Sequence, residues 1–165
     1  MRSGGVSESS SSIRGFKRVS AFLDEKDIEA RIVTLNESTR TSQLAAEALG
    51  CTVAEIAKSI VFRAGEGAVV VVISGDKRVD AKKVSAHIGV KVGNADADTV
   101  KELTGYAIGG VPPFPHDAGV RVILDSSLTR FERVWAAAGT PNSVMNLRVK
   151  QLREIVGAEL VNVAA

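Results

Sequence analysis

The stretch SIVFRAGEGAVVVVIS, residues 59–74, decides the fold of this chain. Two runs rich in valine and isoleucine, residues 59–63 and 68–74, flank the tetrapeptide AGEG, and this pattern predicts two antiparallel strands joined by a hairpin. The second run is apolar at every position from Val69 to Ile73, so we expect both of its faces to be covered. The strand that it forms should therefore lie in the centre of a sheet.

Helices and shorter strands are predicted on both sides of this hairpin from apolar spacing, capping residues and β-branched runs. A capping box, Thr52-Val53-Ala54-Glu55, predicts a short helix that ends near Ala57 or Lys58. Residues 36–42 are expected to be a polar link, in which Thr41 or Ser42 caps the helix that follows and that Gly50 ends. The other expected helices lie at residues 13–26, 41–50, 80–89, 97–105 and 149–157, and the other expected strands at 31–35, 90–92, 119–125, 133–138, 143–147 and 160–163.

Strands outnumber those that a strict βα repeat would supply, so the predicted fold class is α/β, with a mixed, strongly curved, barrel-like sheet surrounded by helices. Residues 13–165 are expected to form one domain, because a chain of 165 residues with 45% hydrophobic and 24% charged content is ordinary for a single core. Residues 1–12 have five serines among the last six positions and no apolar periodicity. We expect them to be a flexible tail.

Composition and missing motifs argue against several functional classes. A formal net charge of +2 is too small to indicate an extended stripe for nucleic acid. A single cysteine excludes an internal disulfide and a cysteine metal cage, and the two histidines form no H-E-x-x-H motif. Glycine-rich phosphate motifs, a G-x-S-x-G motif and a long apolar run are also missing. We therefore expect no metal, no cofactor, no membrane association and a cytoplasmic location.

A second informative stretch is LTGYAIGGVPPFPH, residues 103–116, which holds three of the four prolines and three glycines. Glycines let the backbone approach another molecule closely, while prolines fix the backbone and remove N–H groups. A stiff loop of this kind can point its remaining N–H groups at one carbonyl or phosphate. The same composition is also typical of a tight turn at the end of a strand.

Two side chains are ambiguous on the sequence alone. His116 ends the proline-rich loop and is either a solvent-exposed loop histidine or a residue that reaches the ligand of that loop. Lys58 stands among apolar neighbours where the short helix meets the strand. It either extends to water or holds a single ammonium at the rim of a pocket, where it would bind a phosphate.

Four segments stand in an order and spacing that are specific in combination. They are IAKSIVF at 56–62, VDAKKV at 79–84, LTGY at 103–106 with GGVPP at 109–113, and the strand end at Asp125. Together they resemble the YbaK/ProX family, the free-standing relatives of the editing domain inserted in bacterial prolyl-tRNA synthetases. The resemblance covers residues 19–163, nearly all of the expected domain.

The resemblance implies a compact α/β fold and an enzyme that hydrolyses the ester between a wrong amino acid and its tRNA. It maps the functional lysine of the family onto Lys58 and the G-x-x-x-P substrate loop onto residues 109–113. The candidate substrate-binding residues are Gly109, Gly110, Val111, Pro112, Pro113, His116, Asp125 and Thr140. In relatives the loop backbone holds the aminoacyl group, the lysine engages the phosphate-bearing 3′ end, and the ribose hydroxyl of the substrate positions the water. Positioning and oxyanion stabilisation by loop amides then suffice, without a metal or cofactor.

The predicted function is trans-editing: release of a small amino acid such as alanine, serine, threonine or cysteine from mischarged tRNA. The expected partner is the 3′ acceptor end of aminoacyl-tRNA, a cognate synthetase is a further candidate partner, and the expected assembly is a monomer or homodimer. Two departures from the family bear on which amino acid is accepted: Pro112 stands where many relatives have serine, and Thr140-Pro141 where relatives often have an arginine-glycine pair. The alternatives are a non-catalytic module that binds a tRNA end or anionic ligand, and a general small-ester or thioester hydrolase.

Overall fold

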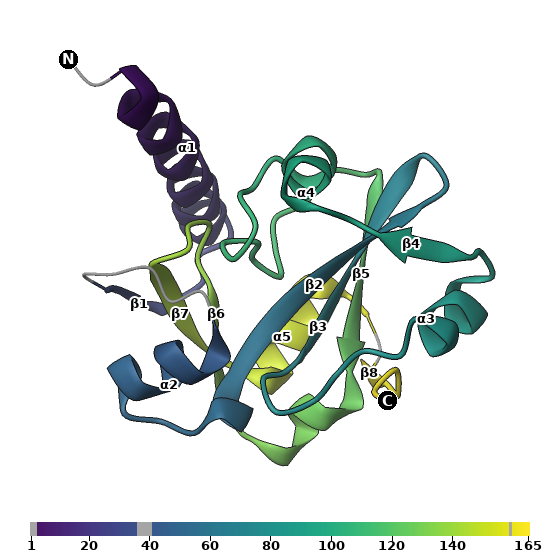
Figure 1. Cartoon of the computed structure of the whole chain (residues 1–165). Helices are drawn as coiled ribbons and strands as arrows, with labels where there is room; N and C mark the ends of the chain where they lie inside the picture. Colours follow the sequence, from purple (N-terminus) through teal and green to yellow (C-terminus); the bar gives the residue numbers. More distant parts are fainter. Residues whose placement is uncertain (1–2, 36–40, 159) are drawn as a thin grey trace.

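The hairpin of residues 59–74 forms the middle of the sheet, as predicted (Figure 1). The computed structural model describes residues 3–35, 41–158 and 160–165. In it, β2 (Ile56–Ala64) and β3 (Gly67–Ser74) are antiparallel partners. β3 is buried from its second residue onward and pairs in parallel with β5 (Val120–Asp125) on its other side. It is therefore a central strand with both faces covered.

The sheet has eight strands and runs in the order β1-β7-β6-β2-β3-β5-β8, with β4 paired to β2 beside this path. The remaining strands are β1 (Arg31–Thr34), β4 (Val92–Asn94), β6 (Arg133–Ala137), β7 (Ser143–Arg148) and β8 (Leu160–Val161). The pairs β2–β6, β3–β5 and β5–β8 are parallel and the other pairs are antiparallel. The predicted mixed α/β sheet is confirmed. Since β1 and β8 end the path, the sheet is open and does not close into a barrel.

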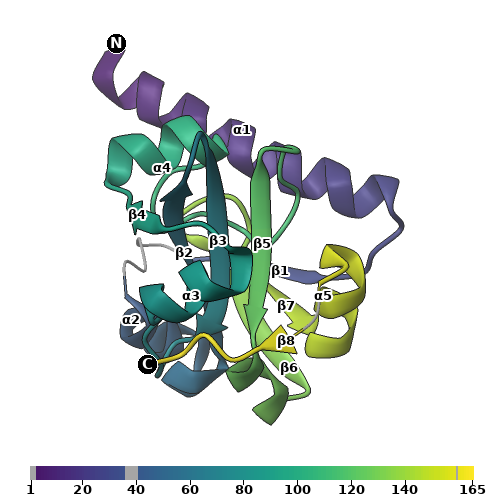
Figure 2. The same ribbon diagram turned by 90° about the vertical axis from the view of Figure 1, so that its right-hand side faces the viewer.

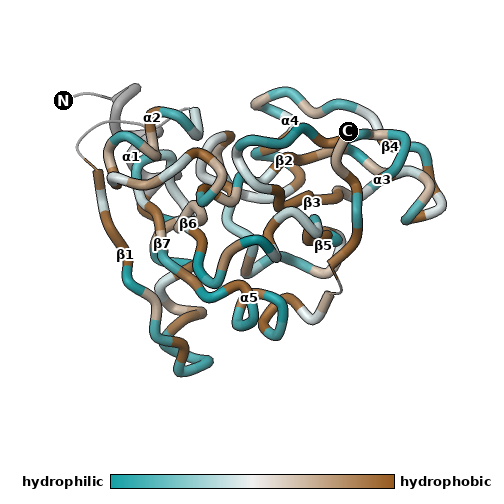
Figure 3. The backbone as a smooth tube through the Cα atoms, turned by 90° about the horizontal axis from the view of Figure 1, so that it is seen from below, coloured by the Kyte–Doolittle hydropathy of each residue, from teal (hydrophilic) through white to brown (hydrophobic). Residues whose placement is uncertain are grey.

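The two faces of the sheet are covered by different helices. α3 (Ala81–Ile88) packs through Val84 against β3 and β5 on one face (Figure 2). On the other face, α1 (Ser3–Glu25), α4 (Ala97–Thr104) and α5 (Val149–Val156) share one core with the inward residues of the strands. The buried hydrophobic residues that these helices contribute to the core are Val19, Leu23, Val100, Val149 and Leu152. Hydropathy colouring shows hydrophobic residues concentrated along the central strands (Figure 3).

The capping box forms as predicted, but the helix that it begins is shorter. Thr52 and Glu55 bond reciprocally around a single 3₁₀ turn, η1 (Val53–Glu55). The turn ends there because Ile56 already pairs with Trp135 of β6. Lys58 is therefore an interior residue of strand β2, not the end of a helix.

The preceding helix, α2 (Ser42–Leu49), has the predicted boundaries. The Thr41 side chain accepts a hydrogen bond from the N–H of Leu44, and Gly50 ends the helix in the left-handed conformation at φ 69°. A second 3₁₀ helix, η2 (Ser126–Arg130), follows β5 and has no counterpart among the sequence predictions.

Helix α1 begins earlier than predicted. The apolar pattern predicts a helix from Ile13 and a flexible tail over residues 1–12, whereas the structure is helical over Ser3–Glu25. Extending an existing helix is much less costly than nucleating one, so a helix anchored on the core through its second half can continue into a serine-rich segment. Residues 1–2, and residues 36–40 of the expected polar link, lie outside the described part of the chain.

Candidate functional site

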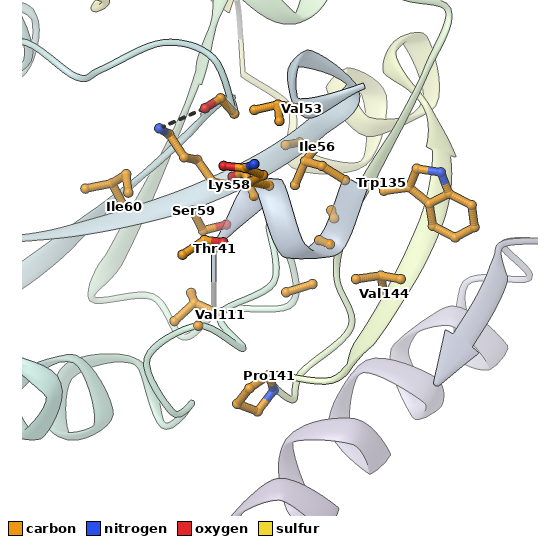
Figure 4. A pocket seen from close by; sticks show the side chains of 18 of the residues that line it. Thr41, Val53, Ile56, Lys58, Ser59, Ile60, Val111, Trp135, Pro141 and Val144 are labelled. Carbon is orange, nitrogen blue, oxygen red and sulfur yellow. Dashed lines mark hydrogen bonds between the residues drawn. The ribbon is translucent and has the colours of Figure 1, made fainter. Parts of the chain in front are cut away.

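A pocket of about 570 Å³ opens where β2, β6, β7, the start of α2 and the loop of residues 105–116 meet (Figure 4). Most of its walls are small or apolar. The lining residues are Thr41, Ser42, Gln43, Ala45, Val53, Ile56, Ala57, Lys58, Ser59, Ile60, Gly75, Ile108, Gly109, Val111, Trp135, Ala136, Ala137, Pro141, Ser143 and Val144. Among these lining residues Lys58 is the only one with a titratable side chain. The pocket thus brings Lys58 together with Gly109 and Val111 of the glycine-proline loop.

Lys58 contributes the ammonium group of the pocket. Its Nζ lies 3.4 Å from the carbonyl oxygen of Gly75, and the side chain is partly buried (Figure 4). Burial lowers the pKa of Lys58, the charge of Asp76 opposes this effect, and the charge of Arg78 adds to it. In the described part of the chain no carboxylate lies within ion-pair distance of Lys58. Its charge is therefore available to an anionic ligand.

The loop of residues 105–116 offers free backbone amide groups to the pocket. Gly109 has φ 85°, a left-handed conformation that favours glycine. The N–H of Gly110 already donates to the carbonyl oxygen of Ala107 over 2.9 Å, and the two prolines that follow Val111 have no N–H. The N–H groups of Ile108, Gly109 and Val111 donate to no acceptor among the described residues. All three residues line the pocket, so their amides are the donors that the loop can give to a ligand.

Buried contacts behind the loop hold its shape. Pro112 and Pro113 are buried and do not line the pocket. The hydroxyl of Tyr106 donates to a carbonyl oxygen of the loop over 2.8 Å, and burial raises the pKa of Tyr106 to about 12. The ring of Phe114 packs against Phe22 of α1 with centroids 5.2 Å apart. The two loop prolines therefore act on the pocket through the backbone that they fix.

Gly110 brings the loop against the turn after β6. A Cβ atom at Gly110 would lie 2.7 Å from the carbonyl carbon of Thr140 and 2.9 Å from the nitrogen of Pro141. Thr140 is itself buried, and its hydroxyl is bonded to Asn142 Oδ1 and Ser143 Oγ. Gly110 and Thr140 thus support the pocket from behind, while Pro141 and Ser143 line it.

His116 braces the loop and does not line the pocket. Its Nε2 lies 2.8 Å from the carbonyl oxygen of Pro112, so Nε2 carries the proton and donates. Its Nδ1 is buried and has no partner among the described residues. Burial lowers the pKa of His116, and the hydrogen bond to Pro112 opposes this effect. Of the two predicted positions, solvent or ligand, the ring takes neither: it faces a carbonyl of its own loop.

Asp125 lies outside the pocket. It is 1% exposed, and its carboxylate accepts hydrogen bonds from the N–H groups of Ser127 at 2.9 Å and Val163 at 2.8 Å. These bonds tie the end of β5 to the C-terminal segment. The structure therefore places Asp125 as an anchor of the fold, and not among the residues that line the pocket with Lys58.

Strand β2 presents unpaired backbone to the pocket, a feature that the sequence did not predict. The N–H of Gly75 donates to the first carbonyl of β2, so even-numbered residues of β2 bond to β3 and odd-numbered residues point the other way. On that side Ala57 pairs with β6 and Arg63 with β4, whereas Ser59 and Val61 have no partner strand among the described residues. The Ser59 hydroxyl is also buried and unpaired there. The only signal in the sequence for this gap in the sheet, where β2 has no partner strand, was a lone serine in an apolar strand.

The ammonium of Lys58, the free loop amides and the small apolar walls together make an α/β domain whose pocket suits a small ligand with a carbonyl or phosphate group. Among the described residues, no three His, Cys, Asp or Glu side chains come together in a way that could hold a metal ion. Nor does that part of the chain contain a helix long and apolar enough to cross a membrane.

Comparisons with known proteins agree with this class. The model of the aminoacyl-tRNA editing domain matches residues 36–155. The uncharacterized protein YwhH of Bacillus subtilis (strain 168) is 36% identical over 139 residues, which cover 84% of this chain and 88% of YwhH. The multifunctional Ser/Thr-tRNA deacylase ProXp-y of Escherichia coli (strain K12) is 28% identical over 152 residues, covering 88% of this chain and 90% of the relative. This chain belongs to the aminoacyl-tRNA editing domain family.

Structural similarity extends over nearly the whole chain. A crystal structure proposed to be that of a trans-editing enzyme for prolyl-tRNA synthetase has a TM-score of 0.84 at 36% identity, covering 92% of this chain and 97% of the other. The proline–tRNA ligase of Thermosipho africanus is 33% identical over 107 residues, but these make up only 18% of the ligase. The expected resemblance to the free-standing relatives of the synthetase editing domain is confirmed.

Proposed function

We propose that this protein is an aminoacyl-tRNA deacylase that acts in trans, hydrolysing the ester between a small amino acid and the 3′ end of a mischarged tRNA. One observation carries the proposal: a single pocket holds the ammonium of Lys58 opposite the free amides of the glycine-proline loop. Membership of the editing-domain family and the similarity to a Ser/Thr-tRNA deacylase support it.

The loop amides are the groups that stabilise the reacting carbonyl. As water attacks the ester, negative charge develops on the carbonyl oxygen, and preorganised N–H donors at that position lower the barrier. The N–H groups of Gly109 and Val111 are free to take this role. Lys58 supplies the complementary positive charge, which binds a phosphate of the 3′ end and fixes the ester against the loop.

The substrate itself positions the attacking water. No aspartate, glutamate or histidine is among the described residues that line the pocket, so we assign the positioning of the attacking water to the ribose hydroxyl next to the ester. Aminoacyl esters are activated, and positioning with oxyanion stabilisation is sufficient for their hydrolysis.

The walls of the pocket favour a small amino acid. Ala57, Ala136, Ala137 and Val144 leave room for a short side chain, and hydroxyl groups such as that of Ser59 can bond to serine or threonine. The unpaired backbone of Ser59 adds a donor and an acceptor that suit the α-amino and carbonyl groups of an amino acid. Alanine, serine, threonine and cysteine are the candidate substrates.

The test is release of amino acid from a panel of mischarged tRNAs by the wild type, by Lys58→Ala and by Lys82→Ala, which removes an exposed lysine from α3. We expect turnover of at least one small aminoacyl-tRNA, a loss of about 100-fold with Lys58→Ala and no change with Lys82→Ala. Saturable tRNA binding with an intact ester would favour the non-catalytic module. Equal turnover of simple model esters would favour a general esterase.

A further inference from the structure

The outer face of β1, β7 and β6 extends from residues that line the pocket to exposed arginines at its other end. Along this face the β6–β7 register places Ala137 opposite Val144 at the pocket, then Trp135 opposite a polar residue, Asn146. β1, β7 and β6 lie side by side at the end of the molecule away from α3 and β4 (Figures 1 and 3). The opposite face of the same strands is buried in the core. The outer face of these three strands therefore forms one continuous surface from the pocket to solvent.

The far end of this face concentrates positive charge. Arg133 of β6 stands directly opposite Arg148 of β7, and both are exposed. On β1, Arg31 pairs with Asn146, and its guanidinium carbon lies 6.0 Å from the centroid of the Trp135 ring. We call Arg31, Trp135, Arg133 and Arg148 the basic face.

Within the described part of the chain, no carboxylate lies at ion-pair distance from the arginines of the basic face. Like charges directly opposite each other on neighbouring strands destabilise a sheet. Arg133 hydrogen-bonds the neutral amide of Asn146 at 3.0 Å, and among the described residues no carboxylate lies within 4.0 Å of Arg133 or Arg148. The hollow beside them, of about 440 Å³, is also lined by Lys150 and by two glutamates, so cations outnumber anions there. An unpaired, exposed guanidinium is well suited to bidentate bonding of phosphate.

The spacing fits a polymer that starts in the pocket. Ala137 lines the pocket and Arg133 lies four positions back along the same strand, a span of about 13 Å at the rise of a β-strand. Trp135 stands midway and also lines the pocket. Planar indole and guanidinium groups are surfaces on which unpaired bases stack, while neighbouring arginines bind the phosphates between them.

We propose that the basic face binds the single-stranded RNA that leads to the aminoacyl end in the pocket. Arg133 and Arg148 hold its phosphates, and Trp135 with Arg31 offers a stacking surface for a base. The direction of the strand rests on the proposed deacylase function, whereas RNA binding at this face can be measured without hydrolysis.

Trp135 reports on this binding directly because it is the only tryptophan of the chain. Its emission is titrated with an uncharged RNA hairpin that ends in a single-stranded 3′ overhang, and with the same hairpin made blunt. We expect a saturable change in emission with the overhang, at least tenfold weaker binding of the blunt hairpin, and loss of affinity as salt is raised. Equal binding of both hairpins, or no change in emission at saturation, would overturn the proposal.

A matched pair of variants separates this face from general charge effects. Arg133→Ala/Arg148→Ala should weaken binding of the labelled overhang hairpin about tenfold or more and reduce the slope of log affinity against log salt by about 2. Lys82→Ala/Lys91→Ala removes the same charge from exposed positions on and after α3 and should change neither. Equal losses from both pairs, or no loss from the arginine pair, would contradict the assignment of this face.

Hydrolysis of a minimal substrate distinguishes the failure of this inference from that of the proposed function. With aminoacyl-adenosine, which lacks the preceding nucleotides, the arginine pair should behave like the wild type, whereas with mischarged tRNA its KM should rise. If the wild type hydrolyses neither substrate but the RNA titrations succeed, the deacylase proposal fails and the RNA-binding face stands. If aminoacyl-adenosine turnover falls equally with the arginine pair, these residues serve the pocket and the assignment to the RNA strand is wrong.

Discussion

Replacing Gly110 by alanine puts a methyl group where the loop meets the turn after β6. The new Cβ would lie 2.7 Å from the carbonyl carbon of Thr140, whereas ordinary contact begins at 3.4 Å, so about 0.7 Å must open between two backbone segments. Thr140 is fixed by its buried hydroxyl bonds, so the loop is the part that moves. The shift displaces the amides of Gly109 and Val111 from the positions that we assign to oxyanion binding.

We expect kcat/KM of Gly110→Ala on a mischarged tRNA to fall about 100-fold, because misplacement on the order of 1 Å has that effect on positioned groups. The free energy of unfolding should fall by about 1–3 kcal/mol, the usual range for overpacking. Gly119→Ala is the matched control: a Cβ there meets nothing within 4 Å, so neither quantity should change. The assays are deacylation kinetics and denaturant melts. A Gly110→Ala protein with a shifted melt but wild-type kcat/KM would refute the role of the loop amides.

Three other results test the assignments of individual residues. Asp125→Ala should lower the free energy of unfolding by about 3 kcal/mol, since it leaves two buried amide donors unpaired, yet kcat per folded molecule should stay constant in a melt-corrected assay; a lower kcat in fully folded protein would place Asp125 in the site. Gly109→Val should reduce deacylation more than His116→Ala, because φ 85° disfavours a side chain by about 1–2 kcal/mol while the histidine acts only from behind the loop; the reverse ranking would contradict this geometry. Deacylation should decline as pH rises through the lowered pKa of Lys58, before the ordinary value of 10.5, because the ammonium loses its charge. Between the folded and the unfolded pKa of Lys58 the free energy of unfolding should rise with pH, because burial disfavours the charged form in the folded state. A Lys58→Ala protein that keeps both pH dependences would show that other groups cause them.

Local features of the fold were predictable because their causes are local. The valine-rich runs around AGEG give the central hairpin, and Thr41 and Gly50 mark the ends of α2 where their capping chemistry places them. The end of η1 was not predictable in this way. It depends on pairing between Ile56 and Trp135, which are far apart in the sequence, and a tertiary ladder overrides the helical tendency of the intervening residues.

In the candidate site, too, the features with local causes were predictable and those that depend on tertiary contacts were not. Lys58 and the loop were found because their residue types are unusual where they stand, and the structure brings them to one pocket. His116 and Asp125 have residue types that suit chemistry, but their orientation depends on contacts that no short motif encodes: one ring faces its own loop and one carboxylate faces two distant amides. The gap in the sheet beside Ser59 results from where two other strands stop, so the residue itself carries almost no trace of it.

The short backbone ladder between β2 and β6 affects how firmly the two parts of the sheet are held together. These strands share two residue pairs, as few as β5 and β8, whereas β2 and β3 share eight and β6 and β7 share five, so the backbone ladder is short where the pocket lies. Lys58 lies on the β2 side of this junction and Val144 on the β6–β7 side. A substrate that contacts both sides links the two parts of the sheet, so the protection of amide hydrogens from exchange should increase in both the β2–β3 and the β6–β7 ladders. Occupancy of the pocket would then stabilise the domain at a short ladder of its central sheet.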